Sequence, residues 1–286
     1  MSSDAGSEAG GLDLFQEPAD YFEPEKPATF ATHRLANGEE VTVRLVGFNP
    51  LWGHHVWQAG RIISTYLESR AATFITDKSV LEFGAGAGLP SLVCALKGAN
   101  TVVVTDYPDA DLIENLEFNV KSCCKKRLEE ESGEEGRRIV ARGYLWGADP
   151  TPLLSFLHTP PQSSPTPGFD TLILADLLFN HSEHAKLIAS VASTLRRSAD
   201  AVALVFFSPY RPWLLEKDVA FFDLARERGF RVEKVWESVM EKVMFEEDRG
   251  DERLRRTVFG FELRWGDLVG EDGGGMERGS VMDWIR

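Results

Sequence analysis

The chain has 286 residues, of which 43% are apolar, and its 45 acidic and 31 basic side chains give a net charge of −14. This apolar content is enough for the packed core of one large domain, which excludes a wholly disordered chain. The acid excess disfavours general binding to nucleic acid, because phosphates require a basic surface. The longest apolar runs, such as residues 201–207, have the length of a strand and not of a membrane span.

The first residues of the chain lack the basic and apolar regions of a secretory signal. The three cysteines, Cys94, Cys123 and Cys124, match neither a disulfide framework nor the spacing of a zinc site. We therefore expect a soluble cytoplasmic protein that is a monomer, with reduced thiols, no bound metal and no membrane association.

The N-terminal part of the chain predicts a tail, a hairpin and a helix. Residues 1–20 are small, acidic and without periodicity, as in a mobile tail. Two alternating stretches flank Asn37-Gly38, the strongest short hairpin signal, and predict a hairpin over about residues 32–46. Apolar residues recur at helical spacing over residues 56–67.

Strands and helices then alternate along the chain. The expected strands are 79–83, 101–106, 137–147, 169–176 and 201–209, followed by an antiparallel pair at 230–239 and 256–265. The expected helices are 90–96, 109–126, 181–196 and 213–228. This order predicts an α/β fold: a three-layer, Rossmann-like, seven-stranded and mainly parallel sheet with an antiparallel last strand. One domain is expected over residues 21–265, with its core at 79–265, and a Gly-rich tail at 266–286 with a short apolar anchor at its end.

The stretch EFGAGAG at residues 82–88 follows the first buried strand. The dinucleotide fingerprint G-x-G-x-x-G would need its third glycine at position 89, which is Leu89. A carboxylate at Glu82 would repel a pyrophosphate, whereas a cationic amino-acid ligand has the opposite preference. The next strand ends in Asp106, where an acid that binds ribose hydroxyls is expected. The combination favours S-adenosylmethionine over a nicotinamide dinucleotide or a turn that binds no ligand.

Five segments resemble a known family. VLEFGAGAGLPSL (80–92) and VTDYP (104–108) are similar to the first motif and the following acid of class I, seven-β-strand S-adenosylmethionine-dependent methyltransferases. LWGHHVWQAGRIISTYL (51–67), YLWG (144–147) and LILADLLFNHSEH (172–184) resemble family 16, the lysine methyltransferases. The last segment is most similar to the fungal members that methylate the N-terminal amine and a lysine of elongation factor 1-alpha.

The resemblance covers about residues 10–265 and departs from the family in three places. Phe83 stands where many relatives have Leu, which changes packing and not chemistry. The acidic run at 129–136 and the proline-rich stretch at 150–168 match nothing in the family, and we expect the acidic run to be a solvated surface loop.

The resemblance also implies the site residues. It places the S-adenosylmethionine site at Trp57, Gly84, Ala85, Gly86, Asp106, Trp146 and Ala175, to which the chemistry of the loop adds Glu82. It places Asp176 and Phe179 beside the target amine. Four of these residues have a purely structural alternative. Asp106 could cap the next helix, Trp57 and Trp146 could be packed in the core, and Asp176 could cap a helix or hold a loop in place.

We expect no metal site at either pair of histidines. His181 and His184, three residues apart, have no identified third ligand, and adjacent His54 and His55 favour loop packing or substrate contact.

The function implied by the resemblance is methylation of elongation factor 1-alpha, a protein substrate, on its N-terminal α-amine and a neighbouring lysine. Two alternatives stay open: N-methylation of a small molecule such as nicotinamide, and a non-catalytic domain that binds the cofactor and a partner. No catalytic base stands out in the sequence, which suits catalysis by proximity.

Overall fold

The computed structural model describes residues 27–47, 49–50, 52–124, 138–157, 167–268 and 280–285. The expected tail at 1–20, the acidic run at 129–136, and parts of the proline-rich stretch and the Gly-rich tail lie outside the described residues.

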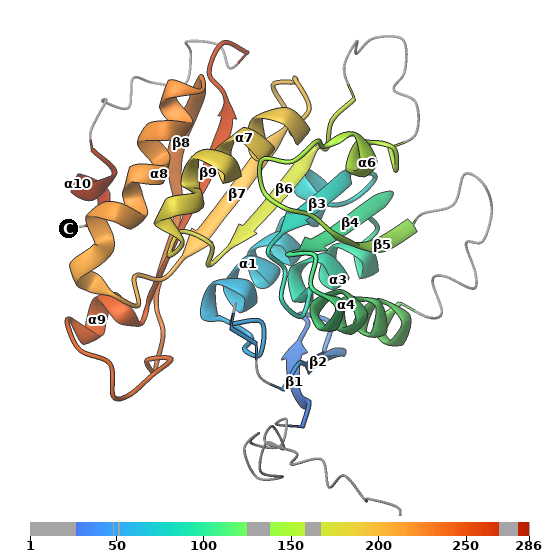
Figure 1. The fold of residues 1–286 in the computed structure, drawn as a ribbon, viewed down its shortest axis with the longest axis horizontal. Helices are drawn as coiled ribbons and strands as arrows, with labels where there is room; N and C mark the ends of the chain where they lie inside the picture. Colours follow the sequence, from blue (N-terminus) through green and yellow to red (C-terminus); the bar gives the residue numbers. More distant parts are fainter. Residues whose placement is uncertain are drawn as a thin grey trace, which may run out of the picture.

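A seven-stranded sheet forms the centre of the molecule (Figure 1), with the strand order β5-β4-β3-β6-β7-β9-β8. Its strands are β3 (Ser79–Phe83), β4 (Thr101–Asp106), β5 (Arg138–Gly143), β6 (Thr171–Ala175), β7 (Val202–Phe207), β8 (Phe230–Val239) and β9 (Thr257–Trp265). Neighbouring strands are parallel except at β9, which runs antiparallel to both β7 and β8. The predicted fold class is confirmed. From β3 the sheet extends through β4 to β5 in one direction, and from β6 it extends through β7 to the antiparallel pair β9-β8 in the other, so the topological switch point lies between β3 and β6.

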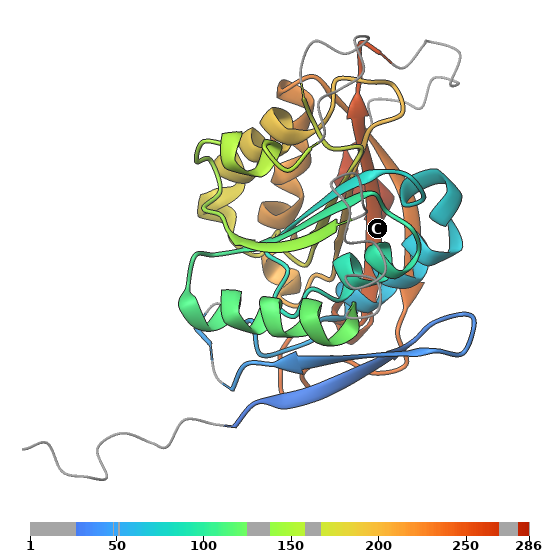
Figure 2. The same ribbon diagram turned by 90° about the vertical axis from the view of Figure 1, so that its right-hand side faces the viewer.

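Helices cover both faces of this sheet, as the turned view shows (Figure 2). One face packs against α1 (Gln58–Ser69), α3 (Leu89–Leu96) and α4 (Ala110–Cys123), and the other against α6 (Thr151–Leu154), α7 (His184–Thr194) and α8 (Leu215–Glu227). Successive side chains of a strand point to opposite faces, so Val80 joins one core and Leu81 the other. This two-sided burial explains why the central strands are continuously apolar in sequence.

Three further short helices complete the described part of the fold. The short helix α2 (Ala71–Phe74) follows α1, and α9 (Glu252–Arg255) precedes β9. The helix α10 (Val281–Ile285) buries Val281 and Ile285 in the same core as α8. None of the helices in the described ranges has the length and apolar character that crossing a bilayer requires.

The predicted hairpin consists of β1 (Thr29–Arg34) and β2 (Glu40–Leu45), and its turn places Gly38 at φ +89°. It packs beneath α4 (Figure 1), where the backbone N–H of Arg44 donates to Asn119 Oδ1 at 2.8 Å. The side-chain amide of Asn119 donates back to the Arg44 carbonyl at 2.9 Å. These two bonds fasten the hairpin to the first half of the sheet.

Several predicted boundaries differ from the structure. The strand expected at 137–147 ends at Gly143, because its partner β4 ends at the paired residue Asp106. Short 3-10 turns, His181–Glu183 and Pro212–Leu214, precede α7 and α8 where longer helices were expected. These changes affect the ends of elements and not their order.

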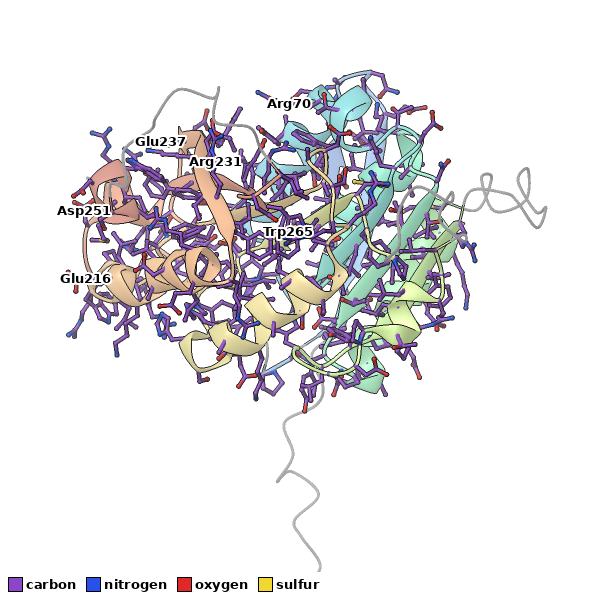
Figure 3. All side chains as sticks on the ribbon, turned by 90° about the horizontal axis from the view of Figure 1, so that it is seen from above. Arg70, Glu216, Arg231, Glu237, Asp251 and Trp265 are labelled. Carbon is purple, nitrogen blue, oxygen red and sulfur yellow. The ribbon has the colours of Figure 1, made fainter. Side chains whose placement is uncertain are left out.

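Strands β5 and β8 are the two edges of the sheet, and β8 carries charged side chains. Figure 3 shows Arg231 and Glu237 along this edge, and Lys234 pairs with Glu237 at 2.6 Å. Charged side chains on an edge strand oppose pairing with a second sheet. These charges therefore disfavour the pairing of a further strand with β8.

Candidate functional site

A cavity of about 520 Å³ opens at the carboxyl ends of β3, β4 and β6, beside the switch point. The segment before α1 and the residues after β5 complete its wall. All ten residues singled out in the sequence line this cavity: Trp57, Glu82, Gly84, Ala85, Gly86, Asp106, Trp146, Ala175, Asp176 and Phe179. The fold thus brings together side chains that are spread over more than a hundred positions of the chain.

The glycine loop between β3 and α3 forms the floor of the cavity. Gly84 and Gly86 have φ of +57° and +56°, the left-handed region that favours glycine. A Cβ on Gly84 would lie 2.5 Å from Cδ2 of Leu177. The backbone at position 84 therefore requires glycine both for its conformation and for the space beside it.

Asp106 ends β4 and holds the glycine loop. Its Oδ2 accepts a hydrogen bond from the Gly86 N–H at 2.6 Å, and its Oδ1 accepts one from the Tyr107 N–H at 2.7 Å. Burial raises the pKa of Asp106, and these two backbone amides oppose that increase. Helix α4 is capped instead by Asp109, which accepts from the Leu112 N–H at 3.3 Å. The carboxylate has four acceptor positions, so both oxygens of Asp106 retain one for a ligand.

Glu82 is 1% exposed and joins the end of β3 to the first turn of α3. Its Oε2 accepts hydrogen bonds from the backbone N–H of Ser91, at 3.0 Å, and from the Ser91 hydroxyl. Burial raises the pKa of Glu82 to about 8, while the bonds from Ser91 lower it. A cationic ligand in the cavity would favour the ionised form of this carboxyl group.

Asp176 fastens three segments at the end of β6. Its Oδ1 accepts from the Ser208 N–H at 2.8 Å, and its Oδ2 accepts from the Ala59 N–H at 3.1 Å and the Tyr210 hydroxyl at 3.2 Å. The bond from Ala59 satisfies one of the free amides in the first turn of α1. Asp176 therefore has the structural role that was considered for it, holding loops together through hydrogen bonds, and its carboxyl group also lines the cavity.

The backbone and the environment of Asp176 are both unusual. Its φ is +55°, which is uncommon for a residue with a Cβ and tolerated best by Asp and Asn. Burial raises the pKa of Asp176 to about 7, and the three hydrogen bonds oppose that increase. A carboxyl group of this kind can exchange a proton near neutral pH.

An aromatic wall, formed by Trp52, His55, Trp57 and Phe245, borders one side of the cavity. The first three line the cavity, and the Phe245 ring packs against them at centroid distances of 6.4, 5.5 and 5.8 Å. Tyr210 lies against Trp57 at 5.1 Å. The indole Nε1–H of Trp57 donates a hydrogen bond to the Trp52 carbonyl at 3.3 Å, which joins two members of the aromatic wall.

Three of the residues around the site were not predicted from the sequence. Tyr210 follows β7, so the rule that sites gather at the carboxyl ends of parallel strands could have found it. Trp52 has a φ of +65° and is 47% exposed at the cavity, for which the sequence gives no signal. Phe245 arrives from the connection between β8 and β9, and its only signal is an isolated aromatic residue in a charged stretch.

The histidines pair with other groups. His181 Nε2 lies 2.6 Å from Asp218 Oδ1, His184 Nε2 lies 2.8 Å from the Leu178 carbonyl, and His54 Nδ1 accepts from the Asn49 N–H at 3.3 Å. Within the described ranges, no three His, Cys, Asp or Glu side chains are grouped as metal ligands would be.

Comparison with known proteins identifies the family. The profile of the family described as lysine methyltransferase matches residues 47–228. The chain is 49% identical to a protein of Emericella nidulans over 89% of this chain and 96% of that protein. It is 48% identical to a Neurospora crassa protein (93% and 92%) and 40% identical to one of Schizosaccharomyces pombe (91% and 97%). All three relatives are named protein N-terminal and lysine N-methyltransferase.

A solved structure shares the fold at low sequence identity. A Streptococcus mutans protein, described as a candidate S-adenosylmethionine-dependent methyltransferase, aligns with a TM-score of 0.50 and 12% identity over 84% of this chain and 56% of its own. The family profile and the curated relatives, which align over most of the chain, are decisive. The chain belongs to the lysine methyltransferase family.

Proposed function

We propose that this chain is an S-adenosylmethionine-dependent protein methyltransferase that modifies the N-terminal α-amine and an adjacent lysine of elongation factor 1-alpha. The observation that carries the proposal is the single cavity lined by all ten expected residues, in a chain 49% identical to a relative named for protein N-terminal and lysine methylation. The choice of elongation factor rests on the resemblance of the segment 172–184 to the fungal members that modify it.

The residues present fit S-adenosylmethionine. A cavity of about 520 Å³ lies within the range of small-molecule sites. Asp106 offers acceptor positions for the two ribose hydroxyls, and Glu82 offers a carboxyl group for the ammonium of the methionine part. The floor at Gly84 and Gly86 has no Cβ, which permits close approach of a ligand to the backbone.

The apolar part of the wall completes this fit. Trp57, Trp146 and Ala175 line the cavity and provide flat or small surfaces for the adenine ring and the sulfonium. When bound, S-adenosylmethionine supplies the methyl group on a positively charged sulfur, which makes that methyl electrophilic.

The acceptor amine is proposed to enter beside Asp176 and Phe179. Phe179 is 43% exposed at the cavity, so it can contact a peptide that comes from solvent. The amine attacks only as the neutral base. Neutralising an N-terminal amine with a pKa of about 8 costs about 1 kcal/mol at pH 7, whereas a lysine with a pKa of about 10.4 costs about 5 kcal/mol. The lysine therefore depends more strongly on burial and on a proton acceptor within the site.

We propose that the protein acts as a monomer. The proposal places the protein in the cytoplasm, where a translation elongation factor works.

The proposal is tested by incubation with methyl-labelled S-adenosylmethionine and either purified elongation factor 1-alpha or nicotinamide. Label in the elongation factor alone supports the proposal, and label in nicotinamide alone assigns a small-molecule methyltransferase. Cofactor binding without label in either acceptor favours a non-catalytic binding domain.

A further inference from the structure

Asp176 lines a second pocket besides the main cavity. This small pocket measures about 20 Å³; its polar lining residues are Asp176, Ser208, Tyr210, Arg211 and Asp218, and its apolar ones are Leu178, Phe179 and Phe207. A space of this volume with several polar neighbours accommodates one water molecule. The carboxyl group of Asp176 is thus placed between the main cavity and a polar site suited to water.

One buried polar atom points to a water in the small pocket. Ser208 is 6% exposed, and its Oγ lies near the Tyr210 hydroxyl without a well-formed hydrogen bond to any described residue. Buried hydroxyl groups are nearly always satisfied by protein or ordered water, so a water in the pocket accounts for this atom. Asp218, on α8, is 5% exposed and lines the same pocket, so the same water can bridge to its carboxyl group.

The small pocket connects to the surface through a histidine. Asp218 Oδ1 lies 2.6 Å from Nε2 of His181, and the side chain of His181 is 24% exposed. The order from the cavity outward is therefore Asp176, the small pocket, Asp218 and His181.

We propose that Asp176, one water in the small pocket, Asp218 and His181 form a route that carries a proton from the acceptor amine to solvent. The inference rests on the proposed function. Each transfer replaces an N–H bond of an ammonium by an N–C bond, releases one proton, and leaves the electron pair of the broken carbon–sulfur bond on sulfur. That proton passes to Asp176, through the water to Asp218, and then to Nε2 of His181, which releases a proton from its other ring nitrogen.

The surrounding charges suit this transfer. Burial raises the pKa of both Asp176 and Asp218 to about 7, so exchange between the two carboxyl groups is nearly balanced in free energy. Burial lowers the pKa of His181, as do the nearby cations, which favours release of the proton. The titratable and charged groups facing this route are Tyr210, Arg211, Lys217 and His184. Tyr210 stays a neutral donor, because burial raises its pKa well above the ordinary value.

Chemical rescue tests the route in the active protein. His181→Ala should lower kcat at least about tenfold at pH 7, and added imidazole should restore most of it, because a small base can replace the missing ring. Asp218→Asn should lower kcat similarly without rescue. The control is Glu216→Gln, on the exposed face of the same helix (Figure 3), which should keep the wild-type rate. An unchanged kcat in His181→Ala, or a loss that imidazole does not restore, overturns the route.

A titration without substrate keeps the inference separate from the proposed function. His181 is followed by NMR in the wild-type protein and in Asp176→Asn, where Asn tolerates the left-handed backbone. Asp176 and Asp218 both lose a proton near pH 7, above the pH at which His181 titrates, so the ring signals of His181 should show an additional step near pH 7. Asp176→Asn should reduce that step, although Asp176 and His181 share no direct hydrogen bond, and Glu216→Gln should leave it unchanged. A step of wild-type size in Asp176→Asn refutes the connection. If the wild-type protein modifies no elongation factor, the proposed function fails while this titration still decides whether the route exists.

Discussion

Asp106→Asn tests the cofactor end of the site with the smallest change of shape. In the structure, the carboxylate accepts from Gly86 and Tyr107, one amide on each oxygen. Asparagine has one acceptor oxygen, so its amino group replaces one of these two oxygens and faces the N–H of Gly86 or Tyr107, which then lacks its acceptor. The variant therefore loosens the glycine loop and loses a charged hydrogen bond to the ligand.

The magnitude follows from these lost bonds. A hydrogen bond to a charged group contributes about 1.5–3 kcal/mol, and a buried N–H left unpaired costs about 1–3 kcal/mol. We expect the affinity for S-adenosylmethionine to fall by about 2–4 kcal/mol, or about 30- to 700-fold in Kd.

Titration calorimetry with S-adenosylmethionine measures this change, and Asp109→Asn is the matched control. Asp109 lies three positions away, caps α4, and is outside the residues that line the cavity. Because Asn caps helices as well as Asp, this control should keep both affinity and stability. A Kd of Asp106→Asn within about threefold of the wild-type value would refute the reasoning about the carboxylate.

Three further predictions concern the glycine loop, Glu82 and Asp176. Gly84→Ala should lower the free energy of unfolding by about 1–3 kcal/mol, because of backbone strain and the contact with Leu177. Gly60→Ala, at a position of α1 with open space around it, should raise the free energy of unfolding by up to about 1 kcal/mol, and denaturant unfolding that ranks the two variants otherwise contradicts the requirement for glycine at position 84. The pKa of Glu82 rises from 4.5 unfolded to about 8 folded, so the unfolded chain loses this proton first and the stability contributed by Glu82 falls by about 5 kcal/mol as pH rises through that range. Glu82→Gln should remove this fall, and equal slopes of unfolding free energy against pH in the two proteins would show that the carboxyl group is not protonated in the fold. Because the pKa of Asp176 is about 7 and that of the N-terminal amine is about 8, the wild-type methylation rate should rise with pH in two steps, whereas Asp176→Asn should be slower and keep only the rise near pH 8 that comes from the amine; a variant with the wild-type pH profile excludes a proton-accepting role.

The residues proposed to bind the cofactor could be predicted to lie together because their signals are local in the sequence. The glycine loop directly follows an apolar strand, and Asp106 ends the next strand, so the geometry of parallel strands brings them together. The resemblance supplied Trp57 and Trp146, whose positions at the cavity could not be derived from spacing alone. The fold class followed from the alternation of strands with helices and was confirmed, whereas the position of β9 between β7 and β8 was not predicted.

The polar contacts of the substrate end could not be read from the sequence, because they depend on long-range packing. Asp176 binds the amide of Ala59 across 117 positions, and no local pattern records that pairing. His181 was considered in the sequence only as a weak metal ligand. Its pairing with Asp218 depends on the packing of α8 beside the 3-10 turn before α7, which no local pattern predicts. Phe245 joined the aromatic wall for the same reason, since the connection that carries it folds back over the start of α1.

The central claim is that this cavity methylates the N-terminal segment of a protein. The most direct measurement is the mass of the N-terminal peptide of elongation factor 1-alpha after incubation with this protein and S-adenosylmethionine, with Asp106→Asn as the negative control. The account predicts added methyl groups, located by fragmentation on the α-amine and on a neighbouring lysine, and far fewer with the variant. An unmodified peptide, under conditions where calorimetry shows the wild-type protein binding the cofactor, would contradict it.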